Sequence, residues 1–199
     1  MKFYIVRHGQ TLFNQKGIIQ GWCDSPLTEQ GIQQARNVAY GLKDIPFTCA
    51  ACSISERAWD TATIIVEGRG IQVHPRKDLK EVHFGTLEGE RLTHGEFFPL
   101  MKNGFTEYGG ETVEQASERF LHALKEIGDT HTGNVLIVAH GAVIAGVLMA
   151  ISKGTLSFED MHLENCSVSI VDYTDNTFTI EQLPTCTYRE KGEKAYGIS

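Results

Sequence analysis

The chain has 199 residues, of which 41% are hydrophobic and 22% charged; this composition is typical of a soluble globular protein, and the length suits one domain with a sizeable core. The net charge of -7 at pH 7 argues against nucleic acid or an anionic membrane as a partner, so any anion-binding site has to be a local cluster of cations. No apolar run approaches the roughly 20 residues of a membrane helix, and the N-terminus shows no signal-peptide pattern, so we expect a cytoplasmic protein.

Apolar runs of strand length alternate with amphipathic, helical runs in the first 75 residues. In chain order these are a strand at 2–6, a helix at 27–44, a strand at 47–53, a helix at 55–70 and a short strand at 71–75. Thr28 and Ser55 are plausible N-caps of the two helices. The five cysteines are scattered, which argues against a disulfide framework. Cys49 and Cys52 form a CxxC pair within a strand, so we interpret them as small buried side chains.

Residues 85–110 interrupt this alternation. They hold six glycines and four aromatic residues, which predict a small, mobile, partly apolar cap. The alternation then resumes with a helix at 111–131, a strand at 134–141, a helix at 142–151 and a hairpin at 166–183 that turns at Asp175 and Asn176. For the tail, 184–199, both folding over the site and disorder remain open.

The alternation of strands and helices predicts an α/β fold. We expect a three-layer sandwich in which a mixed, mostly parallel sheet is flanked by helices, with a small cap over the carboxyl ends of the strands. Residues 1–199 are expected to form a single domain, with 85–110 as its cap segment. Because ligands of parallel sheets bind beyond the carboxyl ends of the strands, the residues at those ends are the first candidates for a site.

Cationic and titratable residues follow three of the predicted strands. Arg7 and His8 end the first strand, and His140 ends the fourth. Arg57 lies one helical turn beyond the second strand. Neighbouring strand residues point to opposite faces, so Arg7 and His8 converge only if the chain leaves the pleat, which we expect Gly9 to permit. If these strands are neighbours, two arginines and two histidines meet in one pocket.

This combination suits a phosphate dianion. Two guanidinium groups match the oxygens of a tetrahedral oxyanion, and a helix N-terminus adds amide donors. A neutral imidazole is a good nucleophile toward phosphorus when a hydrogen bond to its other nitrogen fixes the tautomer. Glu81, expected at the end of a strand, is placed to protonate the leaving alkoxide and then to activate water. His83 and Trp22 are left open between a site and a packing role, and the histidines show no metal-ligand spacing, so neither a metal nor a cofactor is expected.

Six sequence blocks, in order, span residues 3 to about 148. They are VRHGQTLFN, GWCDSPLTEQG, SISERAWDTA, LKEVHFGTLEG, GGETVEQASERF and VLIVAHGAVI. Together they resemble the histidine phosphatase superfamily, also called the phosphoglycerate mutase-like family. The resemblance implies that His8 is phosphorylated and that Glu81 is the proton donor. The residues that it implies for phosphate binding are Arg7, Asn14, Gln20, Gly21, Arg57 and His140.

The family contains both phosphatases and mutases. A mutase has to retain a highly anionic intermediate, which requires extra cations, but residues 86–110 offer only Arg91 and Lys102, and Val82 stands where a mutase would have an arginine. We therefore expect a metal-independent phosphomonoesterase of the histidine acid phosphatase type, acting on a small phosphorylated metabolite. A cofactor-dependent phosphoglycerate mutase and a catalytically vestigial module that binds a phospho-ligand are the alternatives. The identity of the metabolite and a possible homodimer stay open.

Overall fold

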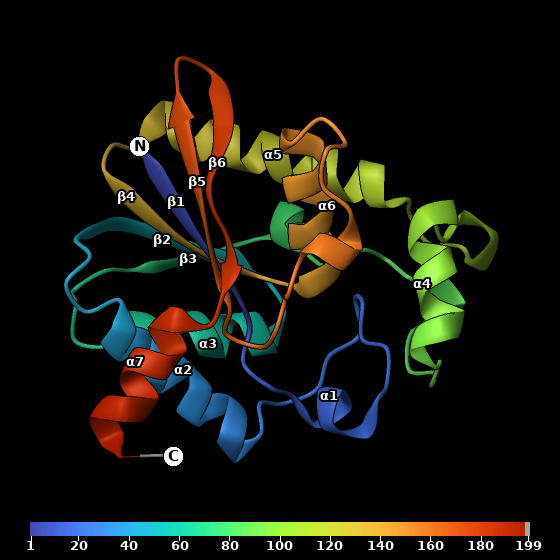
Figure 1. Cartoon of the computed structure of the whole chain (residues 1–199), viewed down its shortest axis with the longest axis horizontal. Helices are drawn as coiled ribbons and strands as arrows, with labels where there is room; N and C mark the ends of the chain where they lie inside the picture. Colours follow the sequence, from blue (N-terminus) through green and yellow to red (C-terminus); the bar gives the residue numbers. More distant parts are fainter. Residues whose placement is uncertain (198–199) are drawn as a thin grey trace.

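A six-stranded mixed sheet with helices on both faces forms the centre of the protein (Figure 1). The computed structural model describes residues 1–197, apart from the side chain of His94. The strands are β1 (Lys2–Arg7), β2 (Phe47–Ser53), β3 (Val73–Arg76), β4 (Asn134–Ala139), β5 (Val168–Thr174) and β6 (Thr177–Thr185). The α-helices are α1 (Leu12–Lys16), α2 (Glu29–Gly41), α3 (Glu56–Val66), α4 (His94–Asn103), α5 (Val113–Thr130), α6 (Gly141–Ile151) and α7 (Thr187–Tyr196). None of the helices in this described part is long and apolar enough to cross a membrane.

The strand order is β3-β2-β4-β1-β5-β6. The strands from β3 to β1 pair in parallel, whereas β5 pairs antiparallel with both β1 and β6. The predicted α/β sandwich with a mixed, mostly parallel sheet is therefore confirmed. Because β2, β4 and β1 are parallel neighbours in the middle of the sheet, their carboxyl ends lie at one edge.

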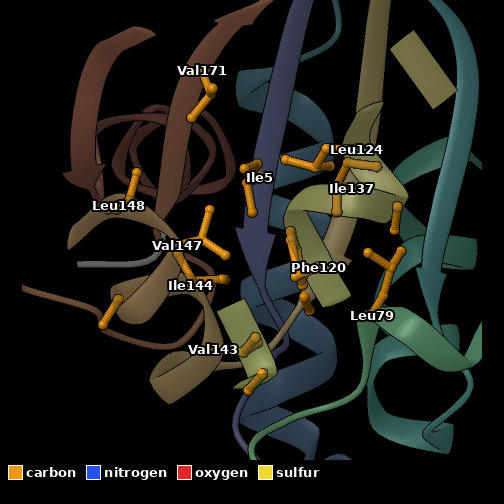
Figure 2. Close-up of a cluster of buried hydrophobic side chains, with 14 of the residues drawn as sticks. Ile5, Leu79, Phe120, Leu124, Ile137, Val143, Ile144, Val147, Leu148 and Val171 are labelled. Atoms are coloured by element: carbon orange, nitrogen blue, oxygen red, sulfur yellow. The ribbon is translucent and has the colours of Figure 1, made fainter. Parts of the chain in front are cut away.

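Two apolar layers attach the helices to the sheet. On one face, Phe120 and Leu124 of α5 and Ile144 of α6 pack with Ile5 of β1 (Figure 2). On the other face, α2 and α3 pack against the alternate residues of the same strands, such as Val6. Successive strand residues point to opposite faces, so a strand covered on both sides is apolar throughout. The CxxC cysteines follow the same rule, because Cys49 belongs to the first layer and Cys52 to the second.

Local signals predicted the starts of two helices and the position of one turn. Thr28 is the N-cap of α2, and its hydroxyl accepts the Gly31 N–H at 3.0 Å. Ser55 is the N-cap of α3, although its side chain makes no capping bond. The predicted hairpin turns at Asp175 and Asn176, whose φ angles of 52° and 58° are those of a tight primed turn.

Three helices were not expected from the sequence, and the first of them is the five-residue α1. The cap segment contains α4, which starts with a capping box between Thr93 and Glu96 but carries Pro99 inside it, a residue that normally argues against a helix. The tail forms α7, which ends at Tyr196 and packs on α2. Gly192 permits that packing, since a Cβ there would lie 2.3 Å from the Asn37 carbonyl oxygen. Figure 1 shows α4 standing away from the sheet, on the side where α1 lies.

The position expected for Glu81 at the end of a strand is wrong. β3 ends at Arg76, and a one-turn helix, Lys77–Leu79, follows it. Glu81 lies in the irregular segment after that turn. Leu79 is fully buried under α5, which anchors this segment close to the sheet.

Candidate active site

The candidate active site is a cavity of about 550 Å³ at the carboxyl ends of the central strands. β1 and β4 stay in register up to Arg7 and Ala139, so the residues that follow, His8 and His140, lie side by side with ring centroids 5.3 Å apart. The polar side chains that line the cavity are those of Arg7, His8, Asn14, Gln20, Arg57 and Glu81. Gly21 also lines it, so His140 is the one predicted site residue that does not.

Gly9 is needed for a reason other than the one predicted. Its φ lies outside the left-handed region, so the turn after β1 does not depend on glycine's conformational freedom. A Cβ on Gly9 would instead lie 2.5 Å from the Gly31 carbonyl oxygen, so glycine allows α2 to approach the site. The Gly9 N–H donates to the Thr61 hydroxyl at 3.0 Å, which fixes the backbone beside His8.

His8 is held as a neutral ring with a defined tautomer. Its Nδ1 lies 2.8 Å from the Gly9 carbonyl oxygen, which can only accept, so Nδ1 carries the proton and Nε2 keeps its lone pair. Burial, together with the charges of Arg57 and Arg7, lowers the pKa of His8 well below its usual value of 6.5. The ring is 3% exposed. A neutral imidazole with a free Nε2 is the form required for attack on phosphorus.

We expect His8 of the free protein to be neutral at pH 6.5, with its proton on Nδ1, because a lowered pKa moves protonation to lower pH. Ring nitrogen chemical shifts of a histidine-labelled sample, followed through a pH titration, measure both properties. Replacing Arg57 with methionine removes a nearby positive charge and should raise the midpoint of the His8 titration. A wild-type midpoint at or above pH 6.5 would contradict this account.

The two arginines are fixed by the protein while keeping donors free. Arg57 is 1% exposed; its Nη1 donates to the Cys23 carbonyl (2.9 Å) and Asp24 carboxylate (2.7 Å), and its Nη2 to the Gly21 carbonyl (2.8 Å). Its Nε has no partner among the described residues. Arg7 donates from Nη1 to the Leu163 carbonyl, and its Nε is likewise buried and unpartnered in this part of the chain. A guanidinium has five N–H donors, so both retain donors for an oxyanion.

The side-chain amides of Asn14 and Gln20 are both oriented by hydrogen bonds to their oxygen atoms. The Asn14 side-chain oxygen accepts the Thr11 N–H at 3.2 Å and the Asn165 amide at 3.2 Å. The Gln20 side-chain oxygen accepts the hydroxyls of Thr11 and Ser25, both at 3.1 Å. With each oxygen occupied, the NH₂ groups are the ends that remain for a ligand. The cavity therefore offers donors from four side chains to an anion.

Glu81 binds the N-terminus of α6. Its Oε1 accepts the N–H groups of Val143 (2.7 Å) and Val82 (2.9 Å), and its Oε2 accepts the Ala142 N–H at 3.0 Å. These bonds and the helix dipole fix the orientation of the carboxyl group. Oε2 accepts only one N–H, so it keeps a lone pair that can hold a proton at the cavity wall.

His140 lies behind His8. It is fully buried, it is the N-cap of α6, and neither ring nitrogen has a hydrogen-bond partner among residues 1–197. Its ring meets the His8 ring at an interplanar angle of 61°. Burial, and then the charge of Arg57, lowers its pKa well below the usual value, so the ring is neutral at neutral pH. His140 does not line the cavity, so the structure does not show the direct contact with phosphate that the sequence led us to expect.

Two charged residues hold the site together although sequence reasoning assigned them no role. Glu88 accepts three backbone N–H groups, those of Trp22 (2.9 Å), Cys23 (2.9 Å) and Phe84 (3.1 Å). Arg119 of α5 donates to three carbonyls of the acid segment, those of Asp78 (2.9 Å), Lys80 (2.7 Å) and Glu81 (2.7 Å). Glu88 lies in the block LKEVHFGTLEG and Arg119 in the block GGETVEQASERF, so membership of these blocks was the sequence feature that could have identified them.

The tail contributes to the site indirectly. Arg189 of α7 donates to the Asn165 carbonyl at 2.8 Å. Asn165 in turn donates from its side chain to the His8 carbonyl at 3.1 Å and to Asn14. The C-terminal helix thus fixes the segment behind His8 and does not cover the cavity.

Trp22 and His83 form a stacked pair beside the cavity. Their ring centroids lie 4.3 Å apart, and the Trp22 indole N–H donates to the Glu81 carbonyl at 2.9 Å. Neither residue lines the cavity. No group of three or more His, Cys, Asp and Glu side chains with metal-binding geometry occurs in the described part of the chain.

Comparisons with known proteins agree with the geometry. A family model described as "Histidine phosphatase superfamily (branch 1)" matches residues 3–185. The probable phosphoglycerate mutase GpmB of Cronobacter sakazakii is 36% identical over 184 residues, which cover 87% of this chain and 85% of the relative. The crystal structure of phosphoglycerate mutase from Bacillus anthracis superimposes with a TM-score of 0.84 at 31% identity, covering 97% of this chain and 96% of that one. Phosphoserine phosphatase from Entamoeba histolytica in complex with 3-phosphoglyceric acid gives 0.80 at 25% identity, covering 94% and 98%.

Proposed function

Because the chain belongs to branch 1 of the histidine phosphatase superfamily, we propose that it is a metal-independent phosphomonoesterase that hydrolyses a small phosphorylated metabolite through a phosphohistidine on His8. The single observation that carries the proposal is the state of His8. Its Nδ1–H is bound to a carbonyl, so Nε2 is free beside two arginines that retain donors. The two guanidiniums supply the positive charge for the phosphoryl oxygens.

In the first half-reaction, His8 Nε2 attacks phosphorus while the bond from phosphorus to the leaving oxygen breaks. Arg7, Arg57 and the amides of Asn14 and Gln20 stabilise the equatorial oxygens. The proton on the Glu81 carboxyl group moves to the leaving oxygen, so the product departs as a neutral alcohol. The positive charge that develops on the His8 ring is stabilised by its Nδ1–H bond to the Gly9 carbonyl.

In the second half-reaction, the Glu81 carboxylate accepts a proton from a water molecule that attacks phosphorus. The bond between phosphorus and His8 Nε2 breaks, and inorganic phosphate leaves. Glu81 is then protonated and His8 neutral, as at the start. In the free protein His140 does not line the cavity, but its ring packs on His8 and both of its ring nitrogens lack a partner among the described residues. These observations support the proposal that it donates to a phosphoryl oxygen once phosphorus is bonded to His8 Nε2.

Residues 85–110 are proposed to act as the cap of a single domain spanning 1–199. In support, Phe97 and Phe98 of α4 line the same cavity as Arg7 and His8. The expected cytoplasmic location, the absence of a cofactor and a homodimer stay predictions.

The direct test is phosphate release from p-nitrophenyl phosphate in the presence of EDTA. We expect full activity in the chelator and inhibition by vanadate, because the arginines rather than a metal bind the phosphoryl group. His8→Ala protein, purified in parallel, controls for a contaminating phosphatase. Complete loss of activity in EDTA, with recovery on adding a divalent metal, would overturn the proposal.

Phosphoglycerate mutase activity is the second candidate, since curated relatives such as that of Cronobacter sakazakii are named probable phosphoglycerate mutases. A mutase interconverts 3- and 2-phosphoglycerate in a reaction that depends on 2,3-bisphosphoglycerate. We expect phosphate release to exceed interconversion, because no cation beyond Arg7 and Arg57 lines the cavity in residues 1–197. Interconversion faster than phosphate release would favour the mutase.

A further inference from the structure

The cavity is lined by two chemically different sets of side chains. One set consists of the phosphate-binding groups described above. The other is apolar and comes from three separate segments; it includes Phe84, Phe97, Phe98, Met101, Phe158 and Met161. A substrate whose phosphate lies at His8 would therefore place its leaving group among aromatic rings and thioethers.

The cations that line the cavity are the two arginines of the phosphate-binding set. In the described residues, the charged side chains that line the cavity are Arg7, Arg57 and Glu81. The two cations of the cap, Arg91 and Lys102, are exposed and do not line it. A second anionic group that packs among the apolar side chains would lose hydration without meeting a cation, which is unfavourable.

Aromatic contacts connect the apolar walls. The rings of Phe98 and Phe158 pack edge to face with centroids 6.0 Å apart, and those of Phe84 and Phe97 do so with centroids 5.3 Å apart. A ring or a branched alkyl chain fits such walls, and Met101 and Met161 can adapt to its shape. The volume of about 550 Å³ lies within the range of small-molecule sites, so the cavity holds both a phosphoryl group and a ring.

We propose that the preferred substrate is a phosphomonoester of an uncharged, largely apolar alcohol or phenol, and that phosphomonoesters bearing a carboxylate are rejected. This inference rests on the proposed function and specifies its substrate class. It separates the protein from the neighbour whose complex contains 3-phosphoglyceric acid, which carries a carboxylate.

The test compares benzyl phosphate, 4-carboxybenzyl phosphate and the methyl ester of the latter. The last two have nearly the same shape and differ in one charge. We expect kcat/KM for the ester to exceed that for the carboxylate by about 100-fold or more, because the carboxylate has no partner in the cavity. Equal or faster hydrolysis of the carboxylate would overturn the substrate class and leave phosphatase activity intact.

Binding of the matching phosphonates tests the substrate class without turnover. Calorimetry with benzylphosphonate and 4-carboxybenzylphosphonate should give dissociation constants that differ by about 30-fold or more in favour of the compound without the carboxylate. Constants within about threefold of one another would overturn the inference. If none of the three phosphomonoesters is hydrolysed, the proposed function is wrong. The binding constants of the phosphonates would still show whether the cavity prefers ligands without a carboxylate.

A matched pair of variants tests whether the cavity lining causes the preference for the methyl ester over the carboxylate. Leu92 lines the cavity, whereas Leu183 lies on β6, 38% exposed and outside it. Leu92→Lys introduces a cation into the apolar lining and should reduce the preference for the methyl ester about tenfold or more. Leu183→Lys makes the same chemical change elsewhere and should leave the preference unchanged. An unchanged preference in Leu92→Lys, with the protein folded, would contradict the inference.

Discussion

Replacing His8 with alanine is expected to lower kcat about 10,000-fold or more, because the covalent route through the imidazole is lost. The ring contributes its free Nε2, fixed by the Nδ1–H bond to the Gly9 carbonyl. Among the side chains that the structure describes, no other imidazole lines the cavity, so none of them can substitute for it there. Steady-state phosphate release from p-nitrophenyl phosphate measures the loss.

His122→Ala is the matched control for that variant. His122 lies on α5 with 71% of its side chain exposed, remote from the cavity walls. It should retain wild-type kcat. Vanadate should still bind His8→Ala, since both arginines remain, so a folded variant can be told from an unfolded one. A kcat within about tenfold of wild type would exclude His8 as the nucleophile.

Replacing Glu81 with glutamine is expected to lower kcat for an alkyl phosphate about 1,000-fold, because the leaving alkoxide loses its proton donor. The loss should be smaller for formation of the phosphoenzyme from p-nitrophenyl phosphate, whose leaving group needs no proton. Hydrolysis of the intermediate should then limit turnover, since the variant also lacks a base for water. A burst of p-nitrophenol in stopped-flow measurements would report this change of limiting step.

Glu114→Gln is the matched control for Glu81→Gln. Glu114 is exposed on the first turn of α5, so its replacement should leave both substrates unaffected. An equal loss for alkyl and p-nitrophenyl phosphate in Glu81→Gln, with no burst, would contradict the role of proton donor. It would instead indicate that the amide, facing the N–H groups of Val82 and Val143, disturbs the start of α6.

The sheet and the candidate nucleophile could be located from the sequence because their signals are local. A strand buried on both faces has to be apolar throughout, so β1 and β4 were recognisable, and the polar residues at their ends stood out. Arg7 and His8 follow one strand and His140 another, and parallel pairing of β1 with β4 brings the histidines together.

The parts that could not be predicted depend on distant contacts. Glu81 has no strand to position it, and its place is set by Arg119 and by the N-terminus of α6. The helix α4 was hidden by Pro99, which normally interrupts a helix. The helix α7 was hidden by a polar sequence, and its packing depends on the close approach of Gly192 to α2. Burial of the Arg57 guanidinium under carbonyls of the 21–24 loop likewise has no sequence pattern.

The central claim is that phosphate passes through a covalent bond to His8. The most direct measurement is an alkaline quench of Glu81→Gln during turnover of a radiolabelled aryl phosphate, followed by peptide mapping of the acid-labile label. We predict that the label accumulates on the peptide containing His8 and is absent from the double variant His8→Ala, Glu81→Gln. Acid-labile label on any other residue, or an unlabelled protein that nevertheless shows the burst of p-nitrophenol, would contradict the account.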